Sequence, residues 1–153
     1  MLRKVERVPI YSIPFEDNRV RELISWYIRM LQKAVDIIWN NITWRYDLKN
    51  YRKRRHAMVK VPVIPKSAGF KRELRNVLME NNPYARHWVV AIIRTAYSIM
   101  DSWRKRYVKG KAKKCKPGIR RRFARCKITL MKVDYKRKVI RICLLYTSDA
   151  ADG

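Results

Sequence analysis

The chain has 153 residues, of which 38 are Lys or Arg and 12 are Asp or Glu, so its formal net charge is +26. Apolar residues make up 48% of the sequence, which excludes a disordered chain and indicates one domain with a real core. Such a charge on a small domain repels itself, and a polyanionic partner relieves the repulsion. Nucleic acid is the common partner of this kind, and an anionic membrane surface is the rarer one.

The sequence carries no sign of secretion or of a membrane span. Residues 1–15 contain charges and prolines but no apolar signal region, and the longest uncharged apolar run, 88–93, is too short to cross a bilayer. The three cysteines form no CxxC pair, and with two histidines they offer no zinc site of plausible spacing. We therefore expect reduced thiols in a cytoplasmic, nucleoid-associated protein with no cofactor and no membrane partner.

Residues 5–13 alternate apolar and polar positions between prolines, which is typical of an edge strand. Asp17 or Asn18 is then placed to cap a long helix of about six turns. Bulky Trp26, Trp39 and Trp44 are expected to pack within this helical part, not to stack on bases. The helical spacing is carried by Val20, Leu23, Ile24, Tyr27, Leu31, Ala34, Ile38 and Ile42.

The middle of the chain alternates breakers and helices. The segment 61–65 (VPVIP) is too rich in proline for either regular element. Ser67 is placed to cap a short helix over 70–79, and Asn82 with Pro83 is typical of the start of a second long helix. Gly110 ends that helix, whose apolar stripe comprises Trp88, Ile92, Ala96, Ile99, Trp103 and Tyr107.

The last part of the chain predicts a basic loop and a hairpin. Residues 111–118 (KAKKCKPG) form the loop, 123–133 alternate as a strand, 134–137 turn the chain, and 138–142 return beside the strand. The order of one strand, three helices and a hairpin predicts an α+β fold. Long helices would be inserted between the strands of an incomplete β-barrel.

The charge is concentrated late in the chain. Between Asp101 and Asp134 there is no acidic residue, and fourteen of the 32 intervening residues are Lys or Arg. Trp103, Tyr107 and Phe123 are interleaved with them, which favours a polyanion that has exposed bases. The sequence therefore predicts nucleic-acid binding.

Four surfaces are candidates for contact with nucleic acid: three groups of residues and the single residue Phe123. The strongest group would grip phosphates, which fixes position but not base sequence; its alternative is a solvated face. Arg52, Lys53, Arg54 and Arg55 form a second basic group. Phe123 is either a base-stacking residue or a core residue at the start of a strand. The strongest group comprises Lys111, Lys113, Lys114, Lys116, Arg120, Arg121, Arg122 and Arg125.

The third group is Tyr84, Arg86 and His87, in the first turn of the helix expected after Pro83. The free N–H groups and the positive dipole end of a helix suit a phosphate. His87 has the alternative of a surface or packing histidine.

The segment 82–142 (NPYARHWVVAIIRTAYSIMDSWRKRYVKGKAKKCKPGIRRRFARCKITLMKVDYKRKVIRI) resembles the N-terminal half of archaeal TnpB-type, or OrfB, proteins. These are transposon-encoded, RNA-guided DNA nucleases. Residues 5–44 are similar to the family's opening strand and first helix. The resemblance implies a first strand of a wedge barrel at 1–15, a helical recognition lobe at 16–110, and a basic loop with a wedge hairpin at 111–142.

The same resemblance implies guide RNA and double-stranded DNA as partners, with Tyr84 and His87 near the motif that flanks the target. The family's catalytic carboxylates, their Mg²⁺ ions and a Zn²⁺ ribbon lie downstream of the matched region. We therefore assign no catalytic residue here and expect the acidic residues to be caps, ion pairs and solvated charges. A self-contained basic ribosome- or chromatin-associated protein is the alternative. A small autonomous nuclease is disfavoured because no acidic or histidine motif is clustered.

Residues 143–152 (CLLYTSDAAD) match one reading frame of an adapter used in preparing sequencing libraries. The alternative is a genuine strand end followed by an acidic terminus. We expect the protein's own sequence to continue differently after Ile142, and we expect 143–153 to be dispensable for folding and for RNA binding.

Overall fold

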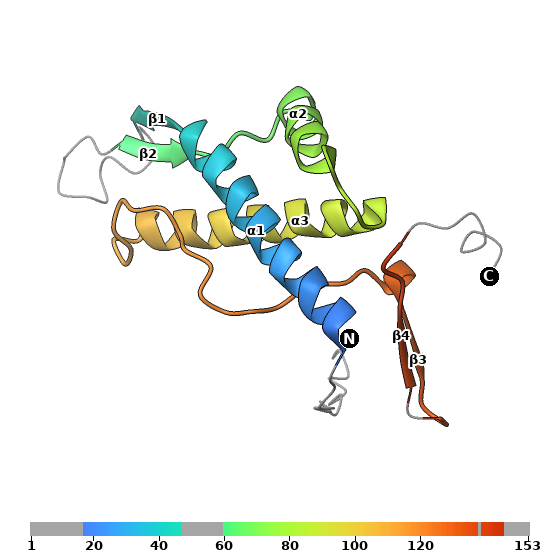
Figure 1. Ribbon diagram of the computed structural model, residues 1–153. Helices are drawn as coiled ribbons and strands as arrows, with labels where there is room; N and C mark the ends of the chain where they lie inside the picture. Colours follow the sequence, from blue (N-terminus) through green and yellow to red (C-terminus); the bar gives the residue numbers. More distant parts are fainter. Residues whose placement is uncertain (1–16, 47–59, 138, 146–153) are drawn as a thin grey trace, which may run out of the picture.

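The computed structural model describes residues 17–46, 60–137 and 139–145, and these form a mixed helix and sheet structure (Figure 1). The helices are α1 (Asn18–Asn40), α2 (Ala68–Met79) and α3 (Arg86–Val108). Strands β1 (Thr43–Tyr46) and β2 (Lys60–Val63) pair antiparallel, as do β3 (Met131–Asp134) and β4 (Val139–Ile142). The predicted α+β class is confirmed. The predicted strand at 5–13 lies outside the described residues.

Helix α1 begins where the sequence predicted. The Asp17 side chain accepts a hydrogen bond from the Arg19 N–H at 2.9 Å and so satisfies one of the free donors of the first turn. The helix ends at Asn40, so Ile42 lies beyond it. Its core face is the predicted stripe widened by Trp26 and Val35; the buried residues are Leu23, Trp26, Tyr27, Leu31, Ala34, Val35 and Ile38.

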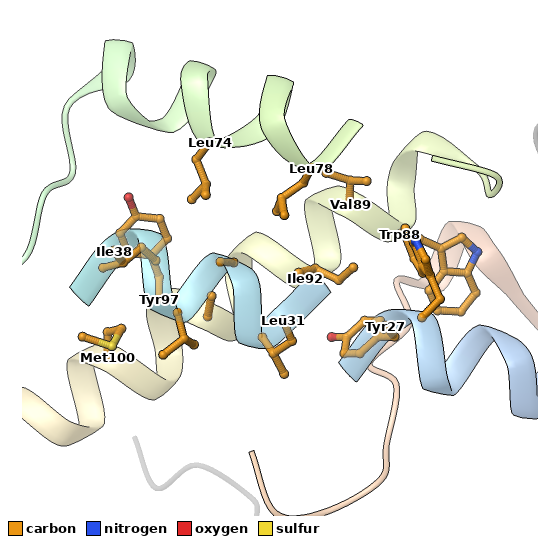
Figure 2. Close-up of a cluster of buried hydrophobic side chains, with 14 of the residues drawn as sticks. Tyr27, Leu31, Ile38, Leu74, Leu78, Trp88, Val89, Ile92, Tyr97 and Met100 are labelled. Carbon is orange, nitrogen blue, oxygen red and sulfur yellow. The ribbon is translucent and has the colours of Figure 1, made fainter. Parts of the chain in front are cut away.

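The core lies where α1 crosses α3, with α2 packed over the crossing (Figure 1). Figure 2 shows Leu74 and Leu78 pointing from α2 into the space beside α1 and α3. Tyr27 of α1 is fully buried, and its hydroxyl lies 2.8 Å from Thr95 Oγ1 of α3. Because the Thr95 hydroxyl donates to the Ala91 carbonyl, Tyr27 is the donor in this pair. A single core therefore unites the three helices.

The segment 61–65 is not irregular throughout, and the prediction that it contains no regular element was wrong. Val61, Pro62 and Val63 belong to β2, with Pro62 opposite Trp44 of β1. The Pro62 carbonyl accepts a hydrogen bond from Arg104 Nε at 2.8 Å, so the backbone polar groups of Pro62 face away from β1. Proline's missing N–H therefore costs no hydrogen bond between the strands.

Helix α3 begins at Arg86, later than the predicted start at Asn82 and Pro83. The Asn82 side chain accepts from the Tyr84 N–H and donates to the Tyr84 carbonyl, both at 2.9 Å. Such local side-chain bonding competes with helix formation and holds a turn instead. The predicted end is confirmed: Gly110 has φ 76°, its N–H donates to Tyr107, and the Lys111 N–H donates to Arg106.

The strand predicted at 123–133 is confirmed only from Met131 onward. Residues 123–127 are irregular, and a 3-10 turn, η2 (Ile128–Leu130), precedes β3. This turn directs Leu130 into the core, where it is 2% exposed. A residue anchored in this way interrupts the alternation that a strand requires.

The hairpin of β3 and β4 lies at the N-terminal end of α3 (Figure 1). Its predicted turn is confirmed, with the Asp134 carboxylate accepting from the N–H groups of Lys136 and Arg137. Every residue of the two strands is exposed, including Val133, Ile140 and other apolar residues. The hairpin therefore leaves apolar surface uncovered among the described residues. No helix in the described part of the chain is long and apolar enough to cross a membrane.

Residues 143 and 144, at the start of the segment expected to be dispensable, contact the core. The Trp88 indole N–H donates to the Cys143 carbonyl at 2.9 Å, and the Ala85 N–H donates to the Leu144 carbonyl at 2.9 Å. The Cys143 N–H donates to Leu130 at 2.8 Å. These contacts indicate a structural role for Cys143 and Leu144, whereas the expectation that residues 143–153 are dispensable for folding stays a prediction.

Chains ending at Leu145 and at Ile142 should differ in thermal stability. The shorter chain loses the hydrogen bonds of residues 143 and 144 to Trp88, Ala85 and Leu130, each of which contributes about 1 kcal/mol. A domain of this size shifts by roughly 2–4 °C per kcal/mol, so its midpoint should fall by about 6–12 °C. Circular dichroism melts of both chains measure this, and equal midpoints would show that Cys143 and Leu144 do not support the fold.

Candidate nucleic-acid interface

The predicted basic loop and the residues after it form an irregular segment, 111–127, which we call the strap. Figure 1 shows the strap leaving the end of α3 and running back across α1 to the hairpin. Apolar side chains from the strap pack against the core while its basic side chains are largely exposed. The core-packed strap residues are Ala112, Ile119, Phe123, Ala124 and Cys126.

Hydrogen bonds along α1 fix the path of the strap. The Ile119 N–H donates to the Gln32 side chain at 3.3 Å, and one guanidinium nitrogen of Arg122 donates to Ser25 Oγ at 2.7 Å. The strap therefore runs opposite in direction to α1. At its start, the Trp103 indole N–H donates to the Lys113 carbonyl at 3.1 Å. Because both backbone and side chains are held, the basic residues project from a defined surface.

The aromatic residues near the start of the strap pack with one another. The Trp103 ring lies 5.0 Å from Trp39 and 5.2 Å from Tyr107, measured between ring centroids. Trp44 joins them, with its ring 5.4 Å from that of Tyr107. The packing role predicted for the tryptophans is confirmed. Trp103 and Tyr107, which suggested base contacts by their place among the cations, belong to this cluster.

Three of the eight predicted phosphate-binding residues already have partners. Besides Arg122, Lys114 Nζ lies 4.3 Å from the centre of the Trp44 ring, and Lys116 Nζ lies 2.9 Å from an Asp36 carboxylate oxygen. Partial burial pushes the pKa of Asp36 upward, but hydrogen bonds from Lys116 and Gln32 outweigh it and leave that pKa lowered. The pair is half exposed and therefore stabilises the fold little.

The other five cations of the group are exposed, and none forms an ion pair with a described residue. No acid separates them along the strap, so they repel one another and would be stabilised by an anion. Exposed cations suit phosphate groups, because a contact to a phosphate needs positive charge and does not depend on the base sequence. They are Lys111, Lys113, Arg120, Arg121 and Arg125.

Phe123 lies under the strap and faces the core. Its ring centroid is 5.9 Å from that of Tyr27, in an edge-to-face arrangement, and its side chain is half buried. Of the two roles left open by the sequence, this position favours packing. The second basic group, Arg52, Lys53, Arg54 and Arg55, lies outside the described residues.

The third predicted group is split by the late start of α3. Arg86 and His87 are exposed in its first turn, whereas Tyr84 precedes the helix with its ring 4.8 Å from that of Trp26. Burial, with a smaller contribution from the Glu22 charge, raises the pKa of Tyr84. Tyr84 lines a hollow of about 490 Å³ with two residues that sequence reasoning missed, Arg21 and Arg29 of α1. Arg21 and Arg29 are exposed and lie two helical turns apart, and this spacing is the feature of the sequence that could have indicated them.

The acidic residues with described contacts act in the expected structural roles. Asp17 caps α1, Asp134 holds the hairpin turn, and Asp36 and Asp101 pair with Lys116 and Lys66. In residues 17–46, 60–137 and 139–145, no three His, Cys, Asp or Glu side chains gather as metal ligands.

The fold and the surface define a small α+β protein in which a cationic strap is bound across a three-helix core. The chain belongs to the uncharacterized protein MJ0013 family, whose profile matches residues 23–143. It is 41% identical over 136 residues to the uncharacterized protein MJ0013 of Methanocaldococcus jannaschii, covering 84% of each chain.

A second relative, from the same organism, has a name that mentions TnpB. The chain is 44% identical over 114 residues to the TnpB-like protein MJ1635, covering 74% of this chain and 25% of that protein. The chain thus spans about a quarter of that relative's length. No solved structure matches. The suspected relation to TnpB-type proteins is therefore supported at the level of a shared segment.

Replacing Phe123 with Leu should weaken the fold and leave RNA affinity unchanged. The loss of the edge contact with Tyr27 should cost about 0.5–1.5 kcal/mol of unfolding free energy, measured by denaturant titration. If Phe123 instead stacked on a base, the variant would lose about 1–3 kcal/mol of binding free energy. An affinity loss of about fivefold or more with unchanged stability would contradict the packing role.

Proposed function

We propose that this chain is the nucleic-acid-binding, N-terminal part of a TnpB-type RNA-guided DNA endonuclease, which holds guide RNA and the duplex that flanks the target. The observation that carries the proposal is the strap, with five exposed cations that have no described ion-pair partner. The shared segment with a TnpB-like protein favours this function over the alternative of a ribosome- or chromatin-associated protein.

The strap is suited to bind a phosphate backbone because it is organised before binding. Its hydrogen bonds to Gln32 and Ser25, and the partial burial of Ile119 and Phe123, fix the backbone that carries the cations. Ordering a loop on binding costs free energy, and a loop already fixed avoids most of that cost. The bound strand would then be positioned without regard to its base sequence.

Base recognition in this proposal falls to the start of α3. Arg86 and His87 are exposed in the first turn, where side chains can approach the edges of bases. Tyr84 is held against Trp26 and would shape the neighbouring hollow, whose arginines, Arg21 and Arg29, would hold the flanking phosphates.

The exposed hairpin fits the proposed wedge. On one face of the hairpin, Met131 and Val133 of β3 lie opposite Ile142 and Ile140 of β4, and all four are exposed, so this apolar face would be covered if further parts of a barrel packed against it. The chain supplies binding and position in this scheme. Asp17, Asp36, Asp101 and Asp134 serve as a cap, ion pairs and a turn, and we assign the carboxylates, Mg²⁺ and Zn²⁺ of the nuclease reaction to other parts of a full-length TnpB-type protein.

The salt dependence of binding tests the strap. If all five free cations contact phosphates, log affinity should fall against log salt with a slope of about −3.5 on single-stranded RNA and about −4.5 on duplex DNA. The double variant Arg120→Ala/Arg121→Ala should flatten the RNA slope by roughly 1.4 and weaken binding to all sequences alike. Fluorescence anisotropy at several salt concentrations measures both quantities.

The control is Arg19→Ala/Arg72→Ala, which removes the same charge at exposed positions outside the strap, where Arg19 pairs with Asp17. It should keep the parental slope. By contrast, His87→Ala should change the ranking of duplex sequences while leaving the slope nearly fixed, because contacts to base edges release few counterions. If the strap variant keeps the parental slope, the strap is only a solvated face and the proposal fails.

A further inference from the structure

A second basic surface lies between α2 and α3, away from the residues that the sequence singled out. The two helices border a hollow of about 740 Å³, and Figure 1 shows α2 lying above α3 there. Val90 and Ile93 of α3 contribute apolar surface to it. We call this hollow the α2–α3 groove. The cations lining it are Lys66, Lys71, Arg75, Arg94 and Lys105.

The cations of the groove are arranged on facing sides of two helices. Lys71 and Arg75 lie one turn apart on α2, and Arg94 and Lys105 lie three turns apart on α3, with Ser98 between them. The acidic residue of the lining is Asp101, and its carboxylate lies 3.0 Å from Lys66 Nζ.

The Asp101 carboxylate is paired with Lys66 and not with the other cations of the groove. Lys71, Arg75, Arg94 and Lys105 form no ion pair with any residue in the described ranges. Four like charges around one hollow repel each other, and an anionic ligand would relieve that repulsion.

The aromatic residue in the groove is not free to stack on a base. The Tyr97 hydroxyl donates to the Pro65 carbonyl at 2.6 Å, and burial, followed by the Asp101 charge, raises the pKa of Tyr97 to about 12. Lys71 Nζ lies over the ring, 5.1 Å from its centroid. The groove therefore offers ammonium, guanidinium and Ser98 hydroxyl groups, which suit phosphates and do not distinguish bases.

Arg94 connects the groove to the strap. Besides lining the groove, Arg94 lines a second hollow of about 510 Å³ together with Arg125 and Lys127 of the strap. Cations therefore follow one another from the strap, around α3, into the α2–α3 groove. A strand held by Arg125 would meet Arg94 next.

We propose that the α2–α3 groove is a second binding site for the phosphates of single-stranded RNA, continuous with the strap through Arg94. This proposal rests on the proposed function, because the same strand would occupy both surfaces. Single-stranded RNA is favoured over a double helix because the hollow of about 740 Å³ lies between two packed helices, where a flexible strand enters more readily than a rigid duplex. It is favoured over an acidic peptide because the cationic lining continues into the strap.

The test compares two double variants that each remove two positive charges from α2 and α3. Arg75→Ala/Lys105→Ala changes the groove, whereas Arg72→Ala/Arg106→Ala changes exposed residues that do not line it. Binding to a 30-nucleotide poly(U) RNA is measured over a range of KCl concentrations, with poly-glutamate as a competing probe. Thermal melts confirm that both variants stay folded.

The groove variant should flatten the slope of log affinity against log salt by roughly 1.4, and the control should not. If the groove variant and the control have equal slopes of log RNA affinity against log salt, the groove proposal is overturned. It is also overturned if the groove variant loses binding to poly-glutamate but keeps its binding to RNA. If Arg120→Ala/Arg121→Ala flattens the slope while the groove variant does not, the groove proposal fails and the proposed function stands. If the parental chain binds poly(U) without salt dependence, both fail.

Discussion

The structure depends most on Tyr27, where three parts of the chain meet. Its hydroxyl donates to Thr95 of α3, its ring meets the edge of Phe123 in the strap, and it is fully buried on α1. Burial is the main reason that the pKa of Tyr27 is raised, so the hydroxyl stays protonated and can remain a donor. Tyr27 thus links the crossing of α1 over α3 to the strap, whose path is also held by the hydrogen bonds to Gln32 and Ser25. Any change there would move the core and the cationic surface together.

This arrangement shows how a small domain carries a formal charge of +26 and still packs a core. In the strap, apolar side chains pack against the helices, and Arg122, Lys116 and Lys114 contact α1 and Trp44, whereas the other five cations of the predicted group are exposed and form no ion pair with a described residue. Ion pairs occupy some cations, but they lie at the surface and contribute little to stability. Repulsion among the remaining cations destabilises the native state. It is reduced when an anion binds, so the charge that limits stability is also what favours binding.

Features that depend on neighbouring residues could be predicted from the sequence, whereas features that depend on contacts between distant segments could not. The Asp17 and Ser67 caps and Gly110 act through neighbouring backbone groups, so their residue types were sufficient. The β2 strand was missed because Pro62 is tolerated only through the orientation that Arg104 stabilises across 42 positions of sequence. The strap was found because its charges are contiguous. The groove was missed because its cations are dispersed over 66–105 and come together only when α2 packs on α3.

Lysine footprinting tests the central claim, that the strap is the surface that contacts RNA, without altering the chain. The protein is acetylated with and without saturating RNA, and the reactivity of each lysine is read by mass spectrometry. Lys111 and Lys113, which are exposed and form no ion pair with any described residue, should lose most of their reactivity when RNA binds. Lys116 should change less, because Asp36 already holds it. If Lys111 and Lys113 keep their full reactivity in the complex, the strap does not face the nucleic acid and the account is contradicted.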